Sequence, residues 1–149
     1  MRKLNLPEYE FRYRDLEGRR EVLDVYRKKY VLLTPEEEVR QRFARYLVED
    51  RSYPASLIMS ECSLSLNGMQ KRCDLLVHKP AGRPMVLVEC KAPDVAIGQG
   101  VFEQAARYNL NLKLPYLMLT NGLKHYCFFV DHKAGKVEPM GSIPDFEAL

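Results

Sequence analysis

Apolar and polar residues alternate along the first thirty positions of the chain. Tyr9, Phe11 and Tyr13 occupy every second position and are separated by charged residues, which is the period of a half-buried β-strand. Segment 15–18 has the composition of a turn, and a second strand-like segment follows it at 22–26. These two segments predict an N-terminal β-hairpin.

A helix is predicted directly after this region. Thr34 is a suitable N-cap, Pro35 suits the first helical position, and Glu37 lies where a capping box places its carboxylate. The apolar residues that follow recur with a helical period until about residue 49. They share one face of the helix, which we expect to be buried: Val39, Phe43, Tyr46 and Leu47.

Three strands, a second helix and two further strands are predicted after the first helix. Asn67 and Gly68 form a strong hairpin signal between the first two of these strands. The third strand is continuously apolar, as expected for a central strand buried on both faces, and the crossover helix makes the next strand parallel to it. The predicted strands are 56–66, 71–78, 85–90, 114–120 and 123–130, and the second helix is 99–113.

These elements predict an α/β fold with an αβββαβ core, in which helices flank a mixed central sheet, plus the N-terminal β-hairpin. A length of 149 residues suits one domain. We divide this domain into a strand-rich extension at 1–31, a core at 32–131 and a loop-like tail at 132–149.

The composition adds little to this picture. A formal net charge of +3 permits an anionic partner without requiring one. Neither an N-terminal apolar segment nor an apolar run long enough for a bilayer is present, so we expect no membrane association and a cytoplasmic location. The four cysteines lack a Cys-x-x-Cys spacing and are interpreted as free thiols: Cys62, Cys73, Cys90 and Cys127.

Three charged residues on two neighbouring strands carry the candidate chemistry. Glu89 and Lys91 are two positions apart and project from one face of the central strand, whereas Cys90 points to the other face. Asp74 lies on the preceding strand, within cross-strand reach of Glu89. Two carboxylates at one place suit Mg²⁺, and Lys91 could orient water or stabilise charge on a phosphate. The alternative is a structural ion pair between Glu89 and Lys91, with Asp74 at a strand end.

The second helix contributes two further polar side chains. Gln104 and Tyr108 are one helical turn apart on one face. Gln104 could bridge to a water or to the Lys91 ammonium, and Tyr108 could donate to a phosphate. A surface glutamine and a packing tyrosine are the alternative interpretation.

Taken together, these motifs resemble those of the PD-(D/E)XK nuclease superfamily. The strings around Asp74 (Lys71–Val77), Glu89 (Val86–Pro93) and the opening helix (Lys29–Gln41) are most similar to the N-terminal nuclease domain of type I restriction enzyme R subunits. Gln104 to Tyr108 resembles the Q-x-x-x-Y motif of the RecB-like branch. The resemblance covers about residues 25–130, and Cys73 replaces the proline of the motif.

This resemblance implies a restriction-endonuclease-like core and a Mg²⁺-dependent nuclease, in which Mn²⁺ can substitute and a metal-activated water attacks the phosphodiester. Asp74, Glu89 and the backbone carbonyl of Cys90 would be metal ligands. Lys91 would be the catalytic lysine, and Gln104 and Tyr108 would support the site. Glu37 matches an accessory carboxylate, although its role as a helix-capping residue is an equal alternative.

Nucleic acid, most simply DNA, is the expected partner, with a homodimer or a motor or specificity subunit as further partners. A catalytically silent nucleic-acid- or protein-binding module is the alternative function. Only a few basic side chains are placed to meet phosphates, so we expect weak binding by the isolated chain. The candidates for nucleic-acid contact are Lys28, Lys29, Arg40, Gln41, Lys71, Arg72 and Arg107, and a solvated segment is the alternative for the cluster at 27–29.

Overall fold

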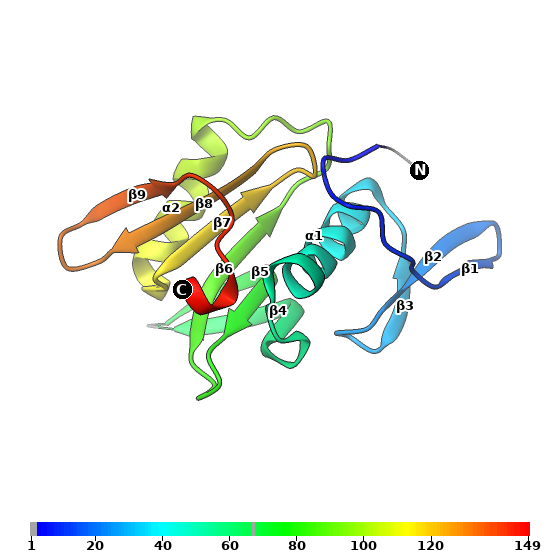
Figure 1. Ribbon diagram of the computed structural model, residues 1–149, viewed down its shortest axis with the longest axis horizontal. Coiled ribbons are helices and arrows are strands. Elements are labelled where there is room, and N and C mark those ends of the chain that lie inside the picture. Colours follow the sequence, from blue (N-terminus) through cyan, green and yellow to red (C-terminus); the bar gives the residue numbers. More distant parts are fainter. Residues whose placement is uncertain (1–2, 67) are drawn as a thin grey trace.

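The computed structural model describes residues 3–66 and 68–149 and contains two β-sheets and two α-helices (Figure 1). The predicted turn at Asn67 lies outside the described residues, as do five side chains: Leu64, Leu66, Met69, Lys71 and Asn111. No helix in the described ranges has the length and apolar character needed to cross a bilayer.

The N-terminal unit is a three-stranded antiparallel sheet instead of the predicted hairpin. It consists of β1 (Tyr13–Leu16), β2 (Arg19–Asp24) and β3 (Lys29–Leu32). The first strand begins later than predicted, because Arg45 holds the preceding segment beside the first helix. The Arg45 Cζ lies 5.9 Å from the ring centroid of Tyr9 and 4.7 Å from that of Phe11. This sheet projects to one side of the molecule (Figure 1).

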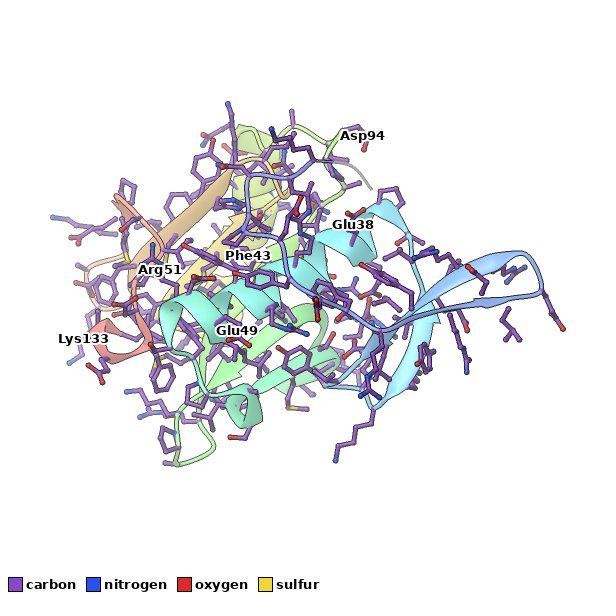
Figure 2. All side chains as sticks on the ribbon, turned by 45° about the vertical axis from the view of Figure 1, so that its right-hand side comes forward. Glu38, Phe43, Glu49, Arg51, Asp94 and Lys133 are labelled. Carbon is purple, nitrogen blue, oxygen red and sulfur yellow. The ribbon has the colours of Figure 1, made fainter. Side chains whose placement is uncertain are left out.

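Helix α1 (Pro35–Arg51) begins where the sequence predicts and ends two residues later than expected. The Thr34 hydroxyl accepts a hydrogen bond from the Glu37 backbone N–H at 3.0 Å, which caps the helix. Phe43 lies at the centre of the molecule (Figure 2) and is fully buried with Val39 and Leu47. The apolar face of the helix therefore packs into the core as predicted.

The second sheet has six strands in the order β4-β5-β6-β7-β8-β9, and all neighbours are antiparallel except β6 and β7. The parallel pair confirms the predicted crossover through α2. The bounds are β4 (Ile58–Leu66), β5 (Met69–His78), β6 (Pro84–Cys90), α2 (Gln99–Leu112), β7 (Tyr116–Thr120), β8 (His125–Asp131) and β9 (Lys136–Met140), with short 3-10 helices η1 (Ala55–Leu57) and η2 (Phe146–Ala148).

Strand β9 corrects the prediction of a loop-like tail. The Asp131 carboxylate accepts the backbone N–H groups of Lys133 and Ala134, and this turn reverses the chain onto β8. Pro139 is tolerated here because β9 is an edge strand of the sheet. The strand is largely exposed, which explains its weak apolar pattern.

The six-stranded sheet is covered by α1 on one face and by α2 on the other (Figure 1). Val86, Val88 and Cys90 of β6 pack in the cluster with α1, whereas Leu87 packs in the cluster with Ala105 of α2. Residues 85 to 90 are all buried, which confirms a central strand covered on both faces. The end of β6 is therefore enclosed by both helices.

Candidate active site

The candidate site lies at the carboxyl end of β6. Glu89 is opposite Leu119 of the parallel strand β7, and the Lys91 backbone N–H continues the ladder by donating to the Thr120 carbonyl at 2.9 Å. This bond holds the backbone of Lys91 beside β7, one residue beyond the end of β6. Cys90 is fully buried on the α1 side, so the alternation predicted for this strand is confirmed.

A pocket of about 40 Å³ lies between the end of β6 and α2. Its polar lining consists of Glu89 and Lys91 from the β6 end and Gln104 and Tyr108 from α2, and Val101 and Ala105 complete it. Four of the predicted site residues therefore meet at one place. The helical spacing of Gln104 and Tyr108 accounts for their shared face.

The Asp74 side chain is hydrogen-bonded to the backbone at the same end of β6. Its Oδ2 accepts the Cys90 N–H at 2.8 Å, and its Oδ1 accepts from Arg40 Nη2 at 3.3 Å. The Asp74 carboxylate therefore lies on the side of α1, whereas Glu89 lines the pocket beside α2. The structure brings Asp74 to the end of β6 but shows it in a cluster of ion pairs centred on α1.

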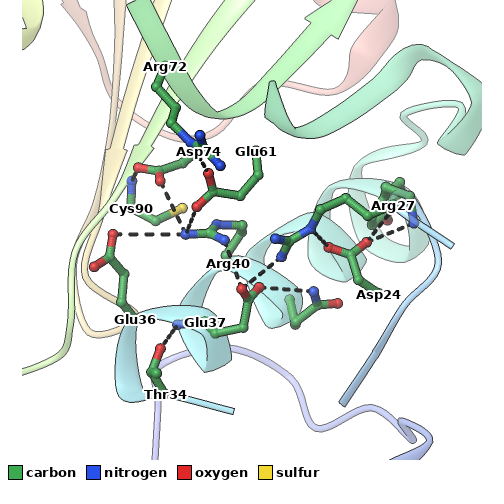
Figure 3. Close-up of polar contacts among 12 residues, drawn as sticks. Asp24, Arg27, Thr34, Glu36, Glu37, Arg40, Glu61, Arg72, Asp74 and Cys90 are labelled. Atoms are coloured by element: carbon green, nitrogen blue, oxygen red, sulfur yellow. Dashed lines mark hydrogen bonds and ion pairs between the residues drawn. The ribbon is translucent and has the colours of Figure 1, made fainter. Parts of the chain in front are cut away.

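Arg40 is the centre of this cluster (Figure 3). Its guanidinium contacts Glu37 Oε1 at 2.8 Å, Glu61 Oε1 at 2.9 Å and Asp74 Oδ1 at 3.3 Å. Only 6% of the Arg40 side chain is exposed. A surface contact with nucleic acid, as predicted from the sequence, is not available to this side chain.

Glu37 is held by two arginines and one amide. Its Oε1 accepts from Arg27 Nη2 at 2.7 Å as well as from Arg40, and its Oε2 accepts from Gln41 Nε2 at 3.0 Å. Gln41 is buried by this contact and, like Arg40, does not form part of an exposed surface. The capping-box interpretation of the Glu37 carboxylate is wrong, because this carboxylate bonds the two arginines and Gln41, and the Thr34 backbone N–H donates to the Leu32 carbonyl at 3.1 Å instead. The accessory role of Glu37 stays a prediction.

Glu36 is a site residue that the sequence analysis missed. Its side chain is 46% exposed and lies 4.0 Å from Arg40 Nη2. Partial burial and the nearby Asp74 carboxylate raise the pKa of Glu36, and the charges of Arg40 and Lys91 oppose that increase. Glu36 therefore shares an electrostatic environment with Asp74 and Lys91. Its four-residue spacing from Arg40 was the available sequence signal.

Glu61 of β4 is a second missed residue. Its backbone has a φ of +49°, which is unusual for a residue other than glycine. Its carboxylate bridges Arg40 and Arg72, with Nε of Arg72 at 2.7 Å. Burial raises the pKa of Glu61, but the Arg72 hydrogen bond and the charges of both arginines outweigh burial and lower it. Nothing in the local sequence of a β-strand indicates this conformation.

The remaining basic candidates differ in their surroundings. Arg72 is exposed while it pairs with Glu61, and Lys28 and Lys29 are exposed where β2 turns into β3. Arg107 is exposed on α2. The Lys71 side chain lies outside the described part of the chain. Lys28, Lys29, Arg72 and Arg107 therefore stay candidates for phosphate contact.

The donor set at this site fits Mg²⁺ better than a thiophilic metal. Asp74, Glu89 and the Cys90 carbonyl supply hard oxygen atoms, and Mg²⁺ needs only one or two carboxylates together with water and substrate phosphates. Burial raises the pKa of the Cys90 thiol well above its ordinary value, so this sulfur stays protonated. Among the described side chains, no group of three or more histidines, cysteines or carboxylates is placed to bind a metal.

Comparison with known proteins adds two findings. Residues 35–144 match the family described as the N terminus of the type I restriction enzyme R protein. A fragment structure described as an HsdR subunit of a type I restriction enzyme from Vibrio vulnificus YJ016 has a TM-score of 0.53 at 22% identity, which shows a shared fold. The match covers 75% of this chain and 24% of that one, and no curated protein matches.

Proposed function

Because the chain belongs to the family of type I restriction enzyme R protein N-termini, we propose that it is a Mg²⁺-dependent nuclease domain that hydrolyses DNA phosphodiester bonds. The observation that carries this proposal is the pocket shared by Glu89, Lys91, Gln104 and Tyr108. The carboxylate can bind a metal, the ammonium can stabilise negative charge on a phosphate, and the amide and the phenol can donate hydrogen bonds to it.

Asp74, Glu89 and the Cys90 carbonyl are the groups of this chain that would hold Mg²⁺. Bound there, Mg²⁺ supplies charge that stabilises the phosphate transition state and lowers the pKa of water. The Cys90 N–H fixes the Asp74 carboxylate through Oδ2. The buried Glu89 is enclosed in the pocket beside Lys91.

Lys91 orients the attacking water and places a positive charge where negative charge develops on the phosphate. Gln104 and Tyr108 approach the same pocket from α2 and can donate hydrogen bonds to a phosphate oxygen or to the water. The rigid ladder around Lys91 supports this role, because its backbone N–H is bonded to β7 at 2.9 Å.

DNA is the proposed substrate, and a motor or specificity subunit or a second copy of the chain is the proposed partner. The matched fragment belongs to a chain about four times longer than the matched region, so partners of the whole protein are proposed here by analogy. A net charge of +3 supports only weak non-specific affinity by the domain itself.

The test is cleavage of supercoiled plasmid and of single-stranded DNA with Mg²⁺ or Mn²⁺. We expect metal-dependent nicking by the wild type and none by Lys91→Ala or Asp74→Ala. Lys133→Ala is the matched control, because Lys133 lies at the periphery of the molecule in the turn before β9 (Figure 2). This variant should cleave DNA like the wild type. Equal cleavage by Lys91→Ala would contradict the proposal. Metal binding without cleavage would favour the catalytically silent module.

A further inference from the structure

Arg40 binds carboxylates from three different elements, and these carboxylates depend on it to different degrees. Glu37 of α1 also pairs with Arg27 at 2.7 Å, and Glu61 of β4 also pairs with Arg72 at 2.7 Å. For Asp74 of β5 the only ion pair among the described residues is with Arg40, at 3.3 Å. Removal of the Arg40 charge would therefore affect Asp74 more than the other two carboxylates.

Among the described residues, the Arg40 guanidinium is held only from its terminal nitrogens. Nη1 contacts Glu37, and Nη2 contacts Glu61, Asp74 and, at 4.0 Å, Glu36. The buried Nε has no hydrogen-bond partner among the described residues. A rotation of this group that releases Asp74 therefore costs no Nε hydrogen bond, and Nη1 can stay on Glu37.

The cluster around Arg40 also carries an excess of negative charge. Five carboxylates (Asp24, Glu36, Glu37, Glu61 and Asp74) face three guanidinium groups (Arg27, Arg40 and Arg72). With the Lys91 ammonium, whose charge acts on Glu36, the formal charge of these groups is −1. The cluster therefore attracts a cation. Asp74 Oδ2 accepts the Cys90 N–H, and Arg40 Nη2 donates to the other carboxylate oxygen, Oδ1.

We propose that Arg40 is a surrogate cation for Asp74, which it holds in place in the metal-free protein and releases to a divalent cation. When the cation binds Asp74 Oδ1, Arg40 keeps its contacts with Glu37 and Glu61. Arg40 is thus a positioning residue with two states, and it competes with the metal. The inference rests on the proposed function in one respect, namely that Asp74 is a metal ligand.

The test is a Mn²⁺ titration of the intact chain by electron paramagnetic resonance, which reads metal binding independently of cleavage. Arg40→Gln removes the competing charge, so we expect Mn²⁺ to bind about tenfold more tightly than to the wild type. Arg51→Gln is the matched control, since it changes an ion-paired arginine at the other end of α1 that contacts Asp145 and should leave the affinity unchanged. Asp74→Asn should lose the site.

A second measurement uses the wild-type side chain and does not depend on the folding of Arg40→Gln. The Nε–Hε resonance of Arg40 in a ¹⁵N spectrum should shift when Mg²⁺ is added to the wild type and should not shift in Asp74→Asn. An unchanged or weaker Mn²⁺ affinity in Arg40→Gln, or an unmoved Arg40 resonance in a protein that binds metal, would overturn the surrogate role alone. Retained Mn²⁺ affinity in Asp74→Asn, or no binding by any variant, would overturn the proposed metal site as well.

Discussion

Glu36 and Glu37 are consecutive residues of α1, yet they belong to different environments. The Glu37 side chain is 8% exposed and lies between Arg27 and Arg40. The Glu36 side chain is 46% exposed, and its pKa is influenced by the charges of Asp74 and Lys91. One step along a helix turns a side chain by about 100°. The first turn of α1 therefore supplies one structural carboxylate and one that faces the candidate site.

This difference predicts stability effects of different size for two chemically identical changes. Glu37→Gln leaves the buried Arg40 and the partly buried Arg27 without their shared carboxylate, and we expect a loss of about 2–4 kcal/mol in the free energy of unfolding. Glu36→Gln should change it by less than about 0.5 kcal/mol, because the side chain is half exposed. Urea denaturation of both variants measures this, and equal losses would contradict the assignment.

Gln104 and Tyr108 are expected to contribute to cleavage. Tyr108→Phe removes one donor from the pocket, so we expect the rate of DNA cleavage to fall by about tenfold or more. Gln104 is exposed, and Gln104→Ala should likewise slow cleavage with little change in the urea midpoint. Tyr30→Phe, in the N-terminal sheet, is the control for loss of a tyrosine hydroxyl. Wild-type rates in both pocket variants would exclude them from the reaction.

His125 should make the protein less stable in mild acid. Its Nε2 lies 2.8 Å from the Asn5 carbonyl, which can only accept, so Nε2 carries the hydrogen and Nδ1 accepts from the Thr120 hydroxyl at 2.7 Å. Burial lowers the pKa of His125, and the Asn5 hydrogen bond opposes this only in part. The unfolded chain therefore takes up a proton first as the pH falls below about 6.5.

The expected result is a lower thermal midpoint at pH 5 than at pH 7.5. His125→Asn should reduce that difference, because it removes the proton uptake that favours the unfolded chain. The pH dependence of the thermal midpoint that remains in the variant includes the contribution of the other two histidines. The same pH dependence in both proteins would show that His125 does not contribute.

Cys62 should be the cysteine that reacts fastest in the native protein. It lies opposite Cys73 in the β4–β5 register, and a hydrogen bond from the Cys73 thiol lowers the pKa of Cys62. Cys73, Cys90 and Cys127 are buried, and burial raises the pKa of Cys127 to about 12. We expect one fast equivalent with Ellman's reagent, four in urea, and loss of the fast phase in Cys62→Ser. Two or more fast thiols would contradict this.

Local patterns predicted most of the core of the fold. The capping residue Thr34 located the start of α1, and the continuous apolar run of β6 identified the strand buried on both faces. Strand β9 escaped prediction because an exposed edge strand needs little apolar alternation. β3 was missed for a related reason, since its residues are at most half buried.

The same distinction holds for the candidate site. Glu89, Lys91, Gln104 and Tyr108 were predicted together because strand and helix periods determine which residues share a face. The burial of Arg40 could not be predicted, since its partners Glu61 and Asp74 are 21 and 34 positions away along the chain. Such a cluster depends on how β4 and β5 pack against α1, which no local pattern encodes.

Both ends of the described chain contribute to one core. Leu4 and Leu6 pack in the α1-side cluster with Ile143, and the Arg42 guanidinium donates to the Leu6 carbonyl at 3.0 Å. The family match begins at residue 35 and ends at 144. A fragment cut at those limits would lose part of its own interior, so the smallest unit that resists proteolysis should extend beyond the region by which the family is recognised.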